Sequence, residues 1–131
     1  MSPTPRLPLR VLIADDSPAL RGLLRDVVSE VDGVEVVAEA QDGVEAVAAS
    51  VLLCVQVLVL DLSMPRKGGI QALQEIRRRE GGPRVIVLTN HAGEMYREAC
   101  LTAGADHFFD KSTEIDRVLD VLRDLARPAQ A

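Results

Sequence analysis

Residues 11–16 read Val-Leu-Ile-Ala-Asp-Asp, a short apolar run that ends in two adjacent carboxylates. Three later runs also lead to polar side chains, namely Val57–Leu60 before Asp61, Val85–Leu88 before Thr89 and His107–Asp110 before Lys111. Because helix-length segments separate these runs, they are typical of buried parallel strands that alternate with helices. In an open parallel sheet, ligands bind outside the carboxyl ends of the strands. The sequence therefore predicts that three carboxylates, a hydroxyl and an ammonium gather at one edge of one sheet.

Composition limits the classes of protein that the chain can belong to. Its 131 residues fit a single domain, and a hydrophobic content of 47% excludes a disordered chain. A net charge of −5 argues against direct nucleic-acid binding. No apolar run approaches the roughly 18 residues of a membrane span. Residues 1–8 are rich in proline and lack the apolar stretch of a signal peptide, so we expect a cytoplasmic protein.

The two cysteines, Cys54 and Cys100, lie far apart in the sequence and show no metal-ligand spacing. We predict that both are buried as small hydrophobic side chains, with a disulfide as the alternative.

Turn and cap signals divide the chain into five strand–helix units. Ser17-Pro18 is typical of a helix start, and Asp42 with Glu45 resembles a capping box. We expect strands near 10–14, 34–38, 55–60, 85–89 and 107–110, and helices near 18–31, 43–48, 70–76, 92–102 and from 112 or 113 to 125. The pattern predicts one doubly wound α/β domain over residues 9–127, with a disordered tail at 1–8 and another tail at 128–131.

The acidic pair Asp15-Asp16, then Asp61, Thr89 and Lys111 on successive strand ends, resembles the receiver domain of two-component response regulators, of the chemotaxis type. The resemblance covers roughly residues 9–125. It is supported by the segment 61–65, which reads Asp-Leu-Ser-Met-Pro, with a glycine eight residues after the aspartate, and by Ala-Gly-Ala-Asp at 103–106. It implies a flavodoxin-like (βα)5 fold with a five-stranded parallel sheet.

The resemblance also implies a role for each site residue. Asp61 would accept a phosphoryl group from the phosphohistidine of a sensor histidine kinase or phosphotransfer protein. Mg²⁺ would be ligated by Asp16, Asp61 and the backbone carbonyl of Ser63, with Asp15 acting mainly through water. Lys111 would pair with the phosphoryl oxygens and Thr89 would donate a hydrogen bond to them. Such a domain assists its own phosphorylation and dephosphorylation without being an enzyme in the usual sense.

Two positions bear on how the site would switch. Phe108 occupies the place of the aromatic switch residue, with ordinary core packing as the alternative. Ser112 follows Lys111 where receivers commonly have proline, often after a cis bond. Because a cis bond before a non-proline residue costs about 3–4 kcal/mol, we expect a trans bond here.

Three functions compete on the sequence alone. The first is a phosphorylation-switched signalling module that acts on an effector protein which the sequence does not identify. The second is a small Mg²⁺-dependent phosphohydrolase, although such enzymes place the nucleophile on the first strand. The third is a degenerate receiver that serves only as a scaffold, which the complete site argues against. With only four residues after Arg127, we expect a stand-alone receiver, and the alternative is the start of a linker in a longer regulator.

Overall fold

The computed structural model describes residues 7–127 and shows five strand–helix units in succession. The strands are β1 (Leu9–Ala14), β2 (Val34–Ala40), β3 (Val57–Leu60), β4 (Arg84–Thr89) and β5 (His107–Asp110). The helices are α1 (Pro18–Ser29), α2 (Gly43–Leu52), α3 (Gly69–Arg77), α4 (Glu94–Thr102) and α5 (Ile115–Ala126). The predicted α/β fold with a five-stranded parallel sheet is confirmed, and the strand order is β2-β1-β3-β4-β5.

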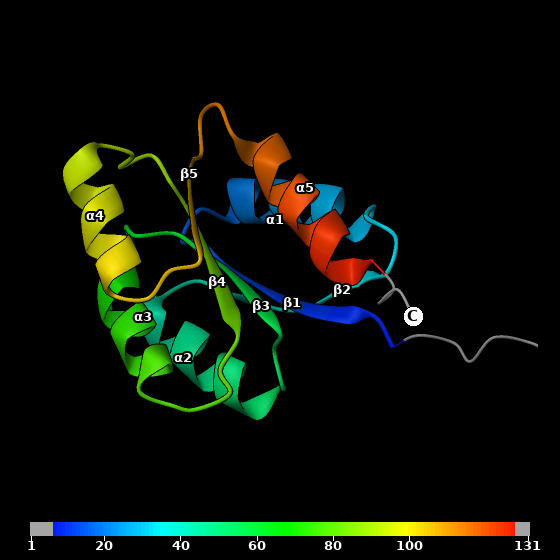
Figure 1. Ribbon diagram of the computed structural model, residues 1–131, viewed down its shortest axis with the longest axis horizontal. Coiled ribbons are helices and arrows are strands. Elements are labelled where there is room, and N and C mark those ends of the chain that lie inside the picture. Colours follow the sequence, from blue (N-terminus) through cyan, green and yellow to red (C-terminus); the bar gives the residue numbers. More distant parts are fainter. Residues whose placement is uncertain (1–6, 128–131) are drawn as a thin grey trace, which may run out of the picture.

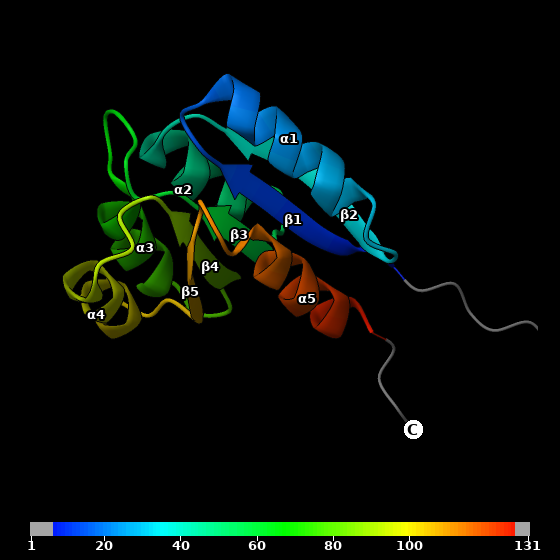
Figure 2. The same cartoon turned by 90° about the horizontal axis from the view of Figure 1, so that it is seen from above.

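Helices cover both faces of the sheet, which gives the domain three layers. Helices α1 and α5 lie together on one face, and α2, α3 and α4 cover the other (Figure 1; Figure 2, seen from above). The chain passes from β1 to the edge strand β2 and then returns past β1 to β3. The connection therefore changes direction between β1 and β3, which is where ligands bind in sheets of this kind.

The central strands β1, β3 and β4 are mostly apolar because both of their faces are buried. Val11 and Ile13 of β1 pack in the cluster that includes residues of α1 and α5. Leu12 and Ala14 point the opposite way, into the cluster with residues of α2, α3 and α4. Burying a Val, Leu or Ile side chain contributes about 1.5–3 kcal/mol each. The unbroken run that precedes Asp15 thus fixes β1 in the centre of the sheet.

The predicted caps of α1 and α2 are confirmed. The Ser17 hydroxyl accepts a hydrogen bond from the Leu20 backbone N–H at 3.3 Å, and Asp42 accepts one from the Glu45 N–H at 2.9 Å. The predicted start of α5 at residue 112 or 113 is wrong, because α5 begins at Ile115. Asp110 holds residues 112–114 in a turn before the helix.

The prediction for the cysteines is right for Cys100 and wrong for Cys54. Cys100 is buried in α4, and both cysteines are free thiols. Cys54 is exposed and lies just after α2 ends at Leu52, in a turn where its backbone is in the left-handed region at φ 51°.

Two further predictions concern membrane spans and the two ends of the chain. None of the helices within residues 7–127 is long and apolar enough to cross a membrane. The tails predicted at 1–8 and 128–131 fall mostly on residues 1–6 and 128–131, which lie outside the described part of the chain.

Candidate functional site

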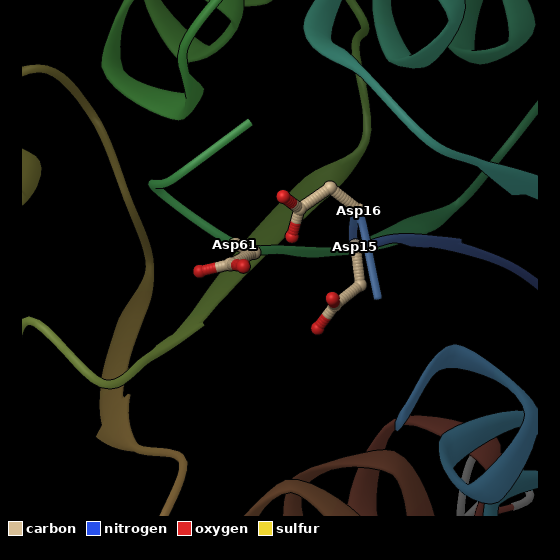
Figure 3. Close-up of side chains that lie close together, drawn as sticks. All are labelled: Asp15, Asp16 and Asp61. Carbon is tan, nitrogen blue, oxygen red and sulfur yellow. The ribbon is translucent and has the colours of Figure 1, made fainter. Parts of the chain in front are cut away.

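The ends of β1 and β3 bring the three predicted carboxylates together. Ala14 and Leu60 are paired in the ladder, so the residues that follow them emerge side by side. The Asp61 backbone N–H donates to the Ala14 carbonyl at 3.0 Å. Carboxylate oxygens of Asp15, Asp16 and Asp61 all lie within 4.8 Å of one another. Figure 3 shows the three side chains grouped at this edge of the sheet.

The three carboxylates differ in their exposure to solvent. Asp15 is 1% exposed and Asp61 is 5% exposed, whereas Asp16 is exposed. Backbone N–H groups orient the two buried carboxylates: Ser17 donates to Asp15 Oδ1 at 2.9 Å, and Ser63 donates to Asp61 Oδ1 at 3.4 Å. Burying an ionised carboxylate is costly unless it is paired, so the site requires a cation.

Lys111 supplies that cation from the end of β5. Its backbone N–H donates to the Thr89 carbonyl at 2.9 Å, which extends the pairing of β4 with β5. Its Nζ donates to Asp15 Oδ2 at 2.7 Å and to Asp61 Oδ2 at 3.0 Å. Burial is the largest single effect on the pKa of Lys111 and lowers it, but the hydrogen bonds to Asp15 and Asp61 together raise the pKa above its usual value. The ammonium is therefore held in its charged form.

The bond between Lys111 and Ser112 is trans, as predicted. Ser112 stands where receivers commonly have proline, and the structure shows what it contacts. Its hydroxyl and its backbone N–H both donate to Asp110 Oδ1, at 2.6 and 2.9 Å. Both bonds lower the pKa of Asp110, and the bond from the hydroxyl has the larger effect. The turn that Asp110 forms with Ser112 thus follows Lys111 without a proline.

Thr89 and Phe108 lie on β4 and β5, the strands that follow β3 in the sheet. Thr89 ends β4 and is fully buried, and its hydroxyl oxygen accepts a hydrogen bond from the His91 backbone N–H at 3.0 Å. Phe108 is 4% exposed and packs in the hydrophobic core between the sheet and helices α2, α3 and α4. The buried ring agrees with the core-packing alternative in this conformation and leaves the switching role as a prediction.

The donor set fits a hard divalent cation. The three clustered aspartates carry three negative charges against the single charge of Lys111, which leaves an excess of two. Oxygen ligands from carboxylates are what Mg²⁺ and Ca²⁺ select. The cluster can therefore bind a metal ion, with exposed Asp16 on its solvent side.

The structure also contains an ion pair near the site that the sequence did not reveal. Asp42 was predicted only as a helix cap, yet it also binds the guanidinium of Arg66 in the loop after β3. Arg66 lies in the left-handed region with φ 65°. Twenty-four residues separate the pair, and no spacing rule connects them, so only the fold brings them together.

Comparisons with known proteins identify the family. The model of the response regulator receiver domain family matches residues 11–123. A protein-glutamate methylesterase/protein-glutamine glutaminase from Myxococcus xanthus is 40% identical over 110 residues, which cover 82% of this chain but 31% of that protein. The chemotaxis protein CheY of Halobacterium salinarum is 33% identical over 116 residues, covering 88% of this chain and 95% of CheY.

A solved structure agrees with these matches. The receiver domain of the response regulator NarL from Mycobacterium tuberculosis superimposes with a TM-score of 0.86 at 27% identity, covering 95% of this chain and all of that one. The sequence match, the shared fold and the polar groups at the strand ends lead to one conclusion. The chain belongs to the response regulator receiver domain family of two-component signal transduction.

Proposed function

We propose that Asp61 is the phosphoacceptor of this receiver and takes its phosphoryl group from the phosphohistidine of a sensor kinase or phosphotransfer protein. The observation that carries the proposal is the place of Asp61. It ends the central strand β3 and is 5% exposed, with the Lys111 ammonium 3.0 Å from its carboxylate. A nearly buried carboxylate beside one cation, at the point where the sheet topology reverses, is suited to bind and attack a phosphoryl group.

The transfer is a displacement at phosphorus. A carboxylate oxygen of Asp61 forms the new P–O bond while the P–N bond of the phosphohistidine breaks. The electron pair of that bond stays on the imidazole nitrogen, which then takes up a proton. Catalysis of such a step consists of positioning and of neutralising charge. Lys111 Nζ, held by Asp15 and Asp61, is placed to pair with the oxygens of the transferred group.

The cofactor of this step is proposed to be Mg²⁺. When bound, it neutralises negative charge on the attacking carboxylate and the phosphoryl oxygens. Asp16 and Asp61 are the proposed direct ligands with the Ser63 carbonyl. Asp15 is assigned to an indirect role through water, beside the Lys111 ammonium that lies 2.7 Å from its Oδ2.

Phosphorylation is proposed to change the face formed by α4, β5 and α5. Thr89 would turn its hydroxyl toward the phosphoryl group, and Phe108 would move into the space that opens. The new hydrogen bond favours one of two packings, so the change is a shift in population. Met95, which is 82% exposed, Tyr96 and Leu101 give α4 an apolar surface that suits a protein partner.

The partners and the setting follow from the same argument. The kinase or phosphotransfer protein supplies the phosphoryl group, and the effector is proposed to be a protein, because a net charge of −5 opposes nucleic-acid binding. The chain spans less than a third of its methylesterase relative and nearly all of CheY. We therefore propose a signalling role in the cytoplasm for the receiver itself and assign no activity to any larger protein.

Incubation with acetyl phosphate and Mg²⁺, followed by intact mass measurement, tests the proposal. The expected result is one phosphoryl adduct in the wild type and none in Asp61→Asn, which is nearly isosteric and should retain its fold. Removal of Mg²⁺ by a chelator should abolish the adduct. An adduct of wild-type abundance in Asp61→Asn would refute the assignment. Sustained hydrolysis of many phosphoesters would instead indicate a phosphohydrolase.

A further inference from the structure

The loop after β3, residues 62–68, carries Ser63 and is held against the start of α2. The Gly43 backbone N–H donates to the Lys67 carbonyl at 3.0 Å. A Cβ atom at Gly43 would lie 2.1 Å from that carbonyl oxygen, so the approach requires glycine. At the far end of the loop, the Gly69 N–H donates to the Leu62 carbonyl at 3.0 Å. The loop is thus closed between its own two ends and fixed to the start of α2, outside the acidic cluster.

Asp42 divides its two carboxylate oxygens between two tasks. Oδ1 accepts the hydrogen bond from Glu45 that caps α2, at 2.9 Å, and Oδ2 accepts the guanidinium of Arg66 in the loop. The Asp42 side chain is 2% exposed and the Arg66 side chain is 62% exposed, so a buried carboxylate is paired with an arginine that stays at the surface. The hydrogen bond from the Glu45 N–H has the largest effect and lowers the pKa of Asp42. The contact with Arg66 lowers this pKa further.

The backbone of Arg66 adopts an unusual conformation in this loop. Its φ of 65° lies in the left-handed region, which residues other than glycine, asparagine and aspartate seldom adopt. A residue keeps such a conformation where its surroundings hold it there. Here the guanidinium reaches Asp42, and Glu45 Oε2 lies 3.7 Å from it.

We propose that Asp42 is a positioning residue for the metal site and acts through Arg66 on the loop that carries the Ser63 carbonyl. This inference rests on the proposed function of the acidic cluster. The Ser63 N–H donates to Asp61 Oδ1 at 3.4 Å, so the same loop also orients the phosphoacceptor. A loop that is already ordered loses less conformational entropy when its carbonyl binds a cation. Outer residues that orient ligands typically change metal affinity by about 10–100-fold.

Asp42→Asn is the decisive variant, because an amide oxygen can still cap α2 while the charge that binds Arg66 is lost. Two measurements apply to it, and neither needs phosphorylation. Amide hydrogen exchange without metal should be faster at Gly43, whose N–H contacts the loop. Isothermal titration calorimetry should show Mg²⁺ binding weakened about tenfold. Phosphorylation at saturating Mg²⁺ should stay near the wild-type level, so that the half-saturating Mg²⁺ concentration moves and the maximal rate does not.

A double-mutant cycle separates this role from a general loss of structure. Arg66→Asn removes the guanidinium but suits a left-handed backbone, so it should weaken Mg²⁺ binding without lowering the melting temperature. Combined with Asp42→Asn, it should add little further loss, because both changes break one contact. Arg66→Lys keeps a cation and should retain most of the affinity. Arg123→Asn on α5, whose ion pair is exposed, should leave Mg²⁺ binding unchanged.

Two outcomes would overturn the inference, and a third would overturn only the proposed function. Mg²⁺ affinity within about twofold of wild type in Asp42→Asn would leave Asp42 as a helix cap, even if Gly43 exchanges faster. If the fold-losses of Mg²⁺ affinity in the two single variants multiply in the double variant, the two residues act separately. If the wild type binds Mg²⁺ but takes up no phosphoryl group, the proposed function fails, while the dependence of Mg²⁺ affinity on Asp42 still stands or falls by calorimetry.

Discussion

Replacing Lys111 with methionine should destabilise the protein more than any other single change of charge near the site. Lys111 Nζ binds Asp15 at 2.7 Å and Asp61 at 3.0 Å, and the three side chains are 7%, 2% and 6% exposed. Removing one partner from a buried ion pair typically costs about 3–5 kcal/mol. Methionine fills a similar volume, so the loss comes mainly from the two carboxylates left without their buried cation. We therefore expect a loss of about 3 kcal/mol in the free energy of unfolding at pH 7 without metal.

Urea unfolding followed by far-ultraviolet circular dichroism measures this loss, since the chain has no tryptophan. Arg123→Met is the matched control, because its ion pair with Asp120 is exposed and should contribute less than about 1 kcal/mol. Saturating Mg²⁺ should restore part of the stability of Lys111→Met and should stabilise it more than it stabilises the wild type. The reason is that Mg²⁺ and the ammonium neutralise the same carboxylates.

The pH dependence of this difference has a definite sign. The pKa of Lys111 is raised in the folded protein, so its contribution is fully present below the ordinary value of 10.5 and is lost only as pH rises through the raised pKa. The difference between wild type and variant should therefore be flat between about pH 7 and pH 9. A loss below about 1 kcal/mol, or equal stabilisation of both proteins by Mg²⁺, would refute the reasoning.

Three further predictions concern neighbouring contacts. Thr89→Ala should still accept the phosphoryl group but bind the effector no better after phosphorylation, which a pull-down of the phosphorylated protein can check. Ser112→Ala should raise the pKa of Asp110 toward its usual value, which NMR titration can follow. In the wild type, the stabilisation from this contact is present above pH 3.8, the ordinary pKa, and is lost as pH falls through the lowered pKa. Gly43→Ala should cost about 1–3 kcal/mol in urea unfolding, because its Cβ meets the Lys67 carbonyl; no loss would contradict the contact.

The sequence predicted the strands and the residues at their ends because both follow from local pattern. A strand covered on two faces must be apolar throughout, so the first polar residue after the apolar run marks the end of the strand. Asp15, Asp61 and Lys111 could therefore be assigned to one edge of the sheet before their distances were known. The caps Ser17 and Asp42 were equally local signals.

The details that the sequence did not predict depend on contacts between distant segments. Cys54 is exposed because α2 stops before it, and its apolar neighbours gave no sign of that end. Helix α5 starts at Ile115 because the Asp110 side chain and carbonyl bind residues 112–114 first. In both cases a single turn decides the outcome, and periodicity over a longer window does not detect it.

Asp42 shows how a correct local prediction can conceal a second role. Its cap on α2 uses only one of the two carboxylate oxygens. The second oxygen contacts Arg66, and that contact exists only because β2 and β3 place their loops at the same edge of the sheet. A serine or asparagine could cap the helix as well, so the cap alone does not require a charge. The charge is explained by the loop after β3, and for that reason Asp42→Asn isolates the second role from the first.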